Sequence, residues 1–180
     1  MITNRPLIIW LSSVLFLILC IIVIGGITRL TTSGLSMVDW QLFMGSIPPL
    51  SKQDWLEVFN AYKQYPEYKK LNFGMSLDEF KFIFFWEYLH RMIGRLIGVA
   101  LIIPYLAFLF KNKLTPILKR RGFIMIILVI MQGLMGWYMV KSGLVDQPQV
   151  SHFRLASHLC LAFFLFQYIW WSLLDLIYSK

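Results

Sequence analysis

Hydrophobic positions along the chain gather into four long runs, separated by segments that are more polar. The runs cover residues 7–27, 82–110, 123–140 and 155–177. A helix needs about 20 mostly apolar residues to cross a bilayer, and each run is near or above that length. The pattern therefore predicts four membrane-spanning helices, with an external loop at about residues 29–78. The predicted limits of the four spans are residues 7–28, 79–110, 122–141 and 153–177.

These runs predict an all-α integral membrane protein, a four-helix bundle that forms a single membrane domain over residues 1–180. Hydrophobic residues make up 58% of the chain, whereas a soluble domain contains roughly 45–50%. The first run is longer than the apolar core of a signal peptide, and no small-x-small cleavage site follows it. We therefore expect the first helix to be retained.

Positive charge is concentrated in the short segment between the second and third spans. Residues 111–121 read KNKLTPILKRR, with five positive charges and no negative one. Short basic loops stay on the cytoplasmic side, or on the matrix side in a mitochondrion. Both termini are then expected on that side, and the long first loop on the outside. The net charge of +8 is thus explained by topology, and nucleic acid is not an expected partner.

The long external loop contains two helix-start signals. Ser51 and Asp54 have the spacing of a capping box, and the apolar residues that follow fall at helical spacing. We expect an amphipathic helix here, lying on the membrane or over the outer mouth of the bundle. A second capping box, Ser76 with Glu79, is expected to begin the second span just outside the bilayer.

Two chemistries are excluded by the placement of cysteines and acids. Cys20 and Cys160 both lie within spans, without a CxxC pair, which argues against a thiol–disulfide oxidoreductase. Glu87 and His90 have the Glu-x-x-His spacing of a di-iron site. Such a site needs further carboxylates, and Asp175, the other acid within a span, lies at the opposite end of the fourth.

The second span holds an unusual group of polar residues, because Glu87, His90, Arg91 and Arg95 fall within nine positions. A charge at the centre of a membrane helix costs roughly 2.5–3.5 kcal/mol, so such residues usually face a protein interior or cavity. Glu87 and Arg91 are four apart in the favourable order for an ion pair. The arginines have an alternative, since long side chains can extend to the lipid headgroups.

A second stripe of this span consists of His90, Gly94 and Gly98, spaced four apart on one helix face. A histidine above two glycines offers a nitrogen ligand beside a flat helix surface, which suits a planar macrocycle. Helix packing through a GxxxG pattern explains the two glycines equally well.

His158, near the outer start of the fourth span, favours haem binding over helix packing as the explanation. Two intramembrane histidines at matching depth in a four-helix bundle are typical of haem ligation. His90 and His158 are therefore the candidate iron ligands, with Gly94 and Gly98 as a flat bed for the ring. His152 is expected to be exposed at the interface. The candidate partners for haem propionates are Arg29, Arg91, Arg95 and Arg154.

Four motifs in order resemble heme A synthase of the proteobacterial and mitochondrial type. They are GGITRLTTSGLSMVDW, EFKFIFFWEYLHRMIGRLIG, MQGLMGWYMVKSGL and VSHFRLASHL. The resemblance implies an integral membrane enzyme that oxidises the C8 methyl of heme O to a formyl group, giving heme A for cytochrome oxidase. It also maps the glutamate and first histidine of the family onto Glu87 and His90, and the second histidine onto His158.

Members of this family usually have two four-helix halves, and this sequence resembles the N-terminal half. The resemblance places a heme B cofactor in the C-terminal half, whose site is absent from this sequence. A split or truncated gene, a half-length chain that pairs with itself, and a fragment of a longer chain remain alternatives. The expected location is a bacterial or mitochondrial inner membrane. The expected partners are lipid, heme O, heme O synthase, oxidase assembly factors, and a second copy or a missing half.

Two other functions remain open on the residues alone. A bis-histidine haem-binding subunit for electron transfer or oxidase assembly, without catalysis, would use the same two histidines. Glu87 argues weakly against it, since a simple electron carrier needs no acid beside its ligand. A structural membrane subunit without cofactor is the third alternative.

Overall fold

The computed structural model describes residues 5–38, 47–143 and 150–178, and these residues form only helices and connecting segments. The described chain contains no strand, which confirms the predicted all-α class. The helices are α1 (Arg5–Leu30), α2 (Lys52–Tyr62), α3 (Pro66–Lys70), α4 (Leu77–Phe110), α5 (Pro116–Gly143) and α6 (His152–Tyr178).

Four of these helices, α1, α4, α5 and α6, are long and apolar enough to cross a membrane, as the sequence predicts. Helix α5 begins at Pro116, before the start predicted for the third span at about residue 122, and the limits of that span in the membrane stay a prediction. Thr115 caps this start by accepting a hydrogen bond from the backbone N–H of Leu118 at 3.2 Å. Proline suits the first helical position, and lysine and arginine are good helix formers, so the helix extends beyond the apolar run.

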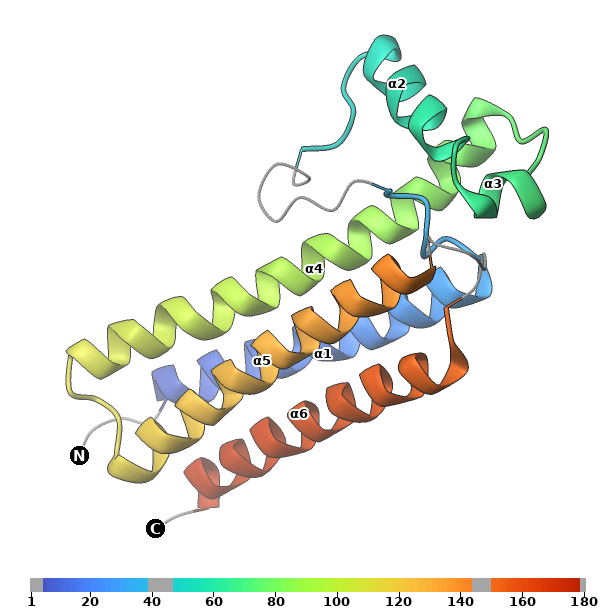
Figure 1. Cartoon of the computed structure of the whole chain (residues 1–180). Helices are drawn as coiled ribbons and strands as arrows, with labels where there is room; N and C mark the ends of the chain where they lie inside the picture. The colour runs from blue at the N-terminus through green and yellow to red at the C-terminus, as the bar shows by residue number, and fades with distance from the viewer. Residues whose placement is uncertain (1–4, 39–46, 144–149, 179–180) are drawn as a thin grey trace. The chain divides into compact units, whose positions relative to one another are not determined.

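The described residues divide into two compact units, each containing parts of all four long helices. The first unit contains Met1–Ile22, Ile93–Leu134 and Ser157–Lys180. The prediction of one membrane domain, with both termini on the cytoplasmic or matrix side, stays a prediction. Within the first unit, the beginning of α1, the connection from α4 to α5 and the end of α6 lie at the same end (Figure 1).

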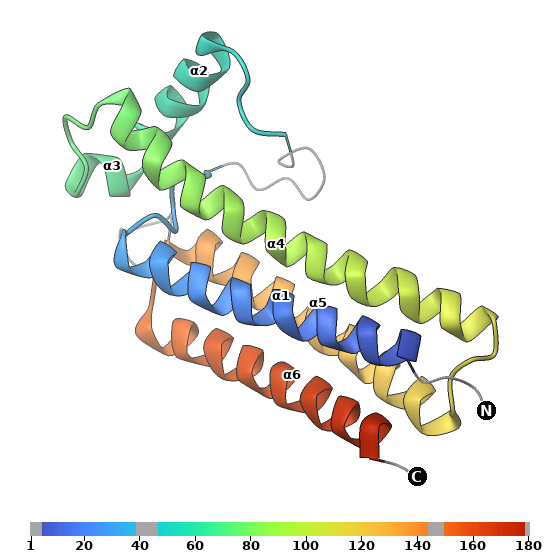
Figure 2. The ribbon, with the colours of Figure 1, turned by 180° about the vertical axis from the view of Figure 1, so that it is seen from behind.

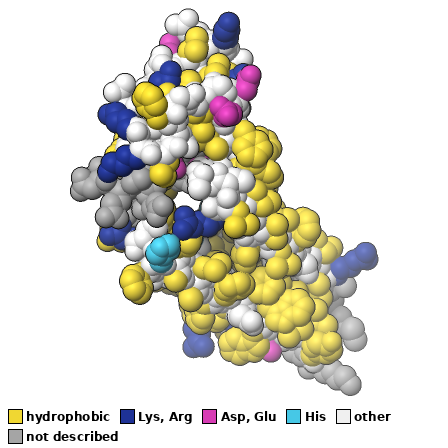
Figure 3. Space-filling view, turned by 90° about the vertical axis from the view of Figure 1, so that its right-hand side faces the viewer, with side chains coloured by type: hydrophobic (Ala, Val, Ile, Leu, Met, Phe, Trp, Pro, Cys, Tyr) yellow, Lys and Arg dark blue, Asp and Glu magenta, His cyan; other side chains and the backbone are white. Residues whose placement is uncertain are grey.

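The core of the first unit is apolar and contributed by all four long helices, which run side by side in it (Figure 2). Its most buried side chains include Leu11, Ile18, Leu101, Met125 and Ile169. The outward surface is also apolar, and Figure 3 shows hydrophobic side chains over most of the visible face of this unit. An apolar surface on helices of this length faces lipid.

Polar groups join the helices of the first unit at two points. The indole N–H of Trp10 donates to the carbonyl of Ala100 at 2.9 Å, which links α1 to α4. Arg121 of α5 pairs with Asp175 of α6 at 2.6 Å, and its guanidinium lies 4.1 Å from the centre of the Trp171 ring. The one acid near the end of the fourth span is therefore bound to the basic start of the third.

The second unit, Val23–Met92 and Met135–Ala156, contains α2, α3 and the ends of the long helices. Both predicted capping boxes are confirmed. Ser51 and Asp54 cap α2 reciprocally, with Ser51 Oγ accepting from the Asp54 N–H at 3.1 Å. The Ser76 N–H donates to the Glu79 carboxylate at 2.7 Å, immediately before α4 begins. The amphipathic character of α2 is confirmed, since Phe59 stacks on Phe80 of α4 at 4.9 Å.

Candidate functional site

Glu87 lies on α4 with only 3% of its surface exposed, and its carboxylate accepts several hydrogen bonds from described residues. Its Oε2 accepts from the Ser36 N–H at 2.7 Å, the Ser36 hydroxyl at 2.7 Å and the Met37 N–H at 2.8 Å. Its Oε1 pairs with Arg91 Nη2. Backbone N–H groups and guanidinium can only donate, so this environment is built for an anionic carboxylate.

The Ser36–Met37 peptide reaches Glu87 because the chain turns sharply after α1. Thr32 adopts a positive φ of 51°, and the Ser33 N–H donates back to the carbonyl of Thr28 at 2.9 Å. Arg91 then donates to the Met37 carbonyl at 3.0 Å. One helical turn of α4 thus binds the N–H groups of Ser36 and Met37 and the C=O group of Met37, an arrangement that we call the Glu87 clamp.

The Glu87–Arg91 ion pair was predicted from spacing and is confirmed. The role of Ser36 was not predicted, because SGLSM reads as an ordinary small-residue turn and its partner lies 51 positions away in the chain. The clamp also engages Arg91, one of the four candidate propionate partners.

His90, one turn from Glu87 on α4, lies with its ring against the backbone of α1. A Cβ added to Gly25 would be 3.2 Å from His90 Nε2 and 3.5 Å from Cδ2. The adjacent Gly26 has no such neighbour within 4 Å. The sequence motif GGITR therefore contains two glycines in different environments, and only Gly25 contacts the predicted ligand.

The two glycines predicted as a flat bed also differ. A Cβ on Gly94 would meet Ile21 Cδ1 of α1 at 3.5 Å, which is ordinary van der Waals contact. A Cβ on Gly98 would meet no atom of another described side chain or helix within 4 Å. Gly94 therefore lies against α1 and Gly98 borders open space, so the role of both as a haem bed stays a prediction.

His158, in the first unit, is contacted by Gln132 of α5. Gln132 Nε2 donates to the His158 carbonyl at 3.0 Å and lies 3.3 Å from the ring Nε2. The His158 Nδ1 and the Gln132 Oε1 are buried and have no hydrogen-bond partner in the part of the chain that the structure describes. An unsatisfied buried polar atom costs roughly 1–3 kcal/mol, so this pair of atoms fits a site that takes a ligand.

Gln132 was not predicted as a site residue, although it is a polar residue within the apolar run of the third span. His90 belongs to the second unit and His158 to the first, so their joint ligation of one iron stays a prediction. The prediction that His152 is exposed is confirmed.

The remaining candidate arginines are placed differently from one another. Arg29 lies at the exposed end of α1. Arg154 is half-buried, with its guanidinium 4.7 Å from the centre of the Tyr138 ring. Arg95 is half-buried on α4. Each of them stays a candidate for propionate binding.

A buried acid that the sequence did not reveal lies outside the spans, on α3. Glu67 is 3% exposed, and its Oε2 is without a hydrogen-bond partner among the described residues. Burial, reinforced by the negative charge of Glu87, raises the pKa of Glu67 to about 8. Tyr62, fully buried beside it, accepts a hydrogen bond from Asn72 Nδ2 at 2.7 Å. Burial, with the charge of Glu67, also raises the pKa of the Tyr62 hydroxyl.

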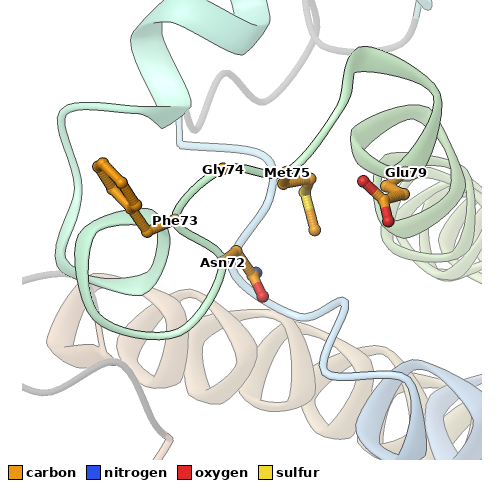
Figure 4. Close-up of a pocket in the computed structure, with 5 residues that line it drawn as sticks. All are labelled: Asn72, Phe73, Gly74, Met75 and Glu79. Atoms are coloured by element: carbon orange, nitrogen blue, oxygen red, sulfur yellow. The ribbon is translucent and has the colours of Figure 1, made fainter.

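Asn72 also borders a pocket of about 280 Å³ beside the start of α4. Its lining is Asn72, Phe73, Gly74, Met75 and Glu79. Figure 4 shows the Phe73 ring turned away from Met75 and Glu79. Among the described residues that line the pocket, Glu79 is the charged one, and its Oε2 is engaged in the helix cap at Ser76.

Four membrane-spanning helices with buried polar residues define an all-helical, multi-pass membrane protein. Residues 8–180 match the COX15-CtaA family, which is described as cytochrome oxidase assembly protein. The chain belongs to this family, which confirms the resemblance seen in its motifs.

Three relatives, each named heme A synthase, show the extent of the match. The protein of Flavobacterium psychrophilum is 51% identical over 179 residues, covering 98% of this chain and 53% of the relative. The protein of Nitrosospira multiformis is 52% identical over 97% of this chain and 49% of its own. The protein of Bradyrhizobium diazoefficiens is 52% identical over 91% of this chain and 45% of its own length. The chain thus spans about half the length of these relatives. No solved structure matches it.

Proposed function

We propose that the chain is the substrate-haem half of a heme A synthase. In this function the C8 methyl group of heme O is oxidised to a formyl group, which gives heme A for cytochrome oxidase. Membership of the family and about 50% identity to proteins named heme A synthase support the proposal. The structural observation that carries it is the Glu87 clamp, which holds a buried carboxylate three residues before His90.

His90 and His158 are the proposed ligands of the haem iron. Haem is the substrate here, and it supplies the macrocycle whose methyl group reacts. The residues present fit such a group, because His158 and Gln132 contribute buried polar atoms without partners. His90 is held against a helix backbone with no side chain at the point of contact. Gly94 and Gly98 are the proposed bed for the ring, and Arg29, Arg95 and Arg154 the proposed partners of the propionates.

Glu87 is proposed to act as a fixed negative charge beside the reacting group. Both of its oxygens already accept hydrogen bonds, so the carboxylate is oriented before substrate arrives. A preoriented charge in a buried site stabilises opposite charge that develops during reaction. Removal of electrons from the methyl carbon develops positive charge there, and a fixed anion favours that step. Arg91 and the Ser36–Met37 peptide are the groups that hold Glu87 in place.

The oxidation needs an electron acceptor, and the family resemblance indicates which kind. Conversion of a methyl group and one water to a formyl group releases four protons and four electrons. We propose that a haem-class acceptor takes the electrons, as the heme B site in the C-terminal half of the family implies. A second half that carries such an acceptor is then required for turnover. The proposed location is a bacterial or mitochondrial inner membrane.

The test is expression of the membrane-embedded chain in cells that make heme O, with and without a C-terminal half of a relative supplied as a separate chain. Extracted haems are then separated and identified. We expect heme A when the wild-type chain is supplied with the C-terminal half, and its loss in His90→Ala and His158→Ala. His152→Ala is the matched control, because His152 is exposed near the start of the same helix. Full heme A production by both ligand variants would refute the proposal.

The alternative function, a bis-histidine haem protein without catalysis, is tested in the same cells. Its support is that the two histidines alone account for haem binding. Bound heme O without conversion, in every combination of halves, would favour it. Glu87→Gln separates the two functions, since it is expected to abolish conversion and to leave haem binding by an electron carrier intact.

A further inference from the structure

The close approach of Gly25 to His90 points to a role for this glycine that the proposed function does not by itself assign. A Cβ at position 25 would lie 3.2 Å from His90 Nε2, which is shorter than ordinary van der Waals contact. At position 26 the same addition would meet nothing within 4 Å. Two adjacent residues of one helix therefore differ in whether they have room for a methyl group.

The backbone of α1 does not itself require glycine at position 25. Both glycines lie inside α1, and neither adopts a positive φ. In a helix interior, glycine is roughly 1 kcal/mol less favourable than alanine. A helix would therefore be more stable with alanine at either position. The feature that distinguishes Gly25 is the space taken by the His90 ring.

The two helices are held at a fixed spacing close to this contact. The Thr28 hydroxyl, about one turn along α1 from Gly25, donates to the Ile24 carbonyl at 2.8 Å. It also lies 3.4 Å from the carbonyl of Trp86, one turn from His90 on α4, which is a weak contact between the helices. The Glu87 clamp binds the segment that follows α1 to the same turn of α4. The clamp opposes separation of the backbones, so we expect a methyl group at position 25 to displace the imidazole ring by a few tenths of an ångström.

We propose that Gly25 is a positioning residue for His90 and sets the place of its Nε2 atom. The inference rests on the proposed function for the identity of the ligand, a haem bound through His90. Groups that orient a metal-ligating histidine typically change metal affinity by about 10-fold to 100-fold when they are altered. Gly25 acts through the space it leaves open, and any side chain there shifts the ligand.

The test compares Gly25→Ala with Gly26→Ala in the full 180-residue chain, reconstituted in lipid nanodiscs. Iron protoporphyrin IX is the probe, titrated while the Soret band is recorded. We expect Gly25→Ala to weaken haem binding about 10-fold or more and to alter the spectrum of the bound haem. Gly26→Ala is expected to bind as the wild type does. The thermal midpoint of each haem-free variant is measured as well, so that loss of the fold is distinguished from displacement of the ring.

A double-mutant comparison tests whether the effect passes through His90. In a His90→Ala background, Gly25→Ala is expected to cause no further change in haem affinity. Equal affinity and identical spectra for Gly25→Ala and Gly26→Ala would overturn the proposal. A further weakening by Gly25→Ala in the absence of the His90 ring would also overturn it.

A measurement without haem separates this proposal from the proposed function. In protein with ¹⁵N-labelled histidine, the His90 ring resonances, assigned with the His90→Ala variant, report the surroundings of the imidazole. Gly25→Ala should shift them and Gly26→Ala should not. If the wild type binds no haem, the proposed function fails, while these resonances still decide the role of Gly25. Unchanged His90 resonances in Gly25→Ala would reject that role.

Discussion

The substitution Glu67→Gln should remove most of a pH dependence from the stability of the second unit. Glu67 is buried on α3, and one of its oxygens has no partner among the described residues. The pKa of this carboxyl is raised from 4.5 to about 8, first by burial and then by the charge of Glu87. Glutamine keeps the shape and neutral polarity of the protonated acid, so it isolates the effect of charge.

The direction in which stability changes with pH follows from proton linkage. Between pH 4.5 and about 8 the folded chain holds the Glu67 proton and the unfolded chain releases it, so stability falls as pH rises. One proton gives a slope of at most about 1.4 kcal/mol per pH unit. From pH 5 to pH 7 the loss is therefore up to about 3 kcal/mol. The full contribution of the neutral acid is present below the unfolded pKa, and little further change is expected above pH 8.

The assay is thermal unfolding of the reconstituted chain from pH 5 to pH 9, followed by tryptophan fluorescence. Trp55 is a useful reporter, because its ring packs 5.1 Å from that of Phe84 in the same unit as Glu67. The wild type should lose stability over this range, and Glu67→Gln should lose clearly less. Glu57→Gln on the exposed side of α2 is the matched control and should follow the wild type. Equal pH slopes in wild type and Glu67→Gln would refute the argument.

Three further predictions concern the groups around the two histidines. Ser36→Ala removes one hydrogen-bond donor from the Glu87 carboxylate and should lower the free energy of unfolding by about 1.5–3 kcal/mol, measured by thermal unfolding. Ser36→Thr keeps the hydroxyl, and equal stability of the two variants would contradict a role for the hydroxyl. Arg91→Gln leaves a buried charge unpaired and should destabilise by about 3–5 kcal/mol, whereas the double variant with Glu87→Gln should recover stability; absence of recovery would contradict the ion-pair argument. Gln132→Leu frees the His158 ring and should shift the spectrum of bound haem, whereas an unchanged spectrum would show that Gln132 does not orient it.

Features that depend on near neighbours in the chain were predictable from the sequence. The four spans follow from the length of the apolar runs, and the described chain has four helices that are long and apolar enough to cross a membrane. The caps at Ser51 and Ser76 and the Glu87–Arg91 pair were found because their partners are three or four residues away. Helical geometry fixes such distances whatever the rest of the chain does. The polar turn at Pro116 that begins α5 lies before the apolar run, so apolar length alone does not indicate it.

The contacts that define the candidate site were decided only by tertiary structure. Ser36 approaches Glu87 across 51 positions, and Gln132 approaches His158 across 26. Nothing in SGLSM or MQGLM indicates which residue each will meet. Glu67 reads as a solvated acid in PEYKK, and only the packing of α2 and α3 buries it. Periodicity tells which residues share a helix face, but the neighbour of that face depends on how the helices pack. The sequence therefore supplied the spans and the candidate ligands, and packing selected the groups that hold them.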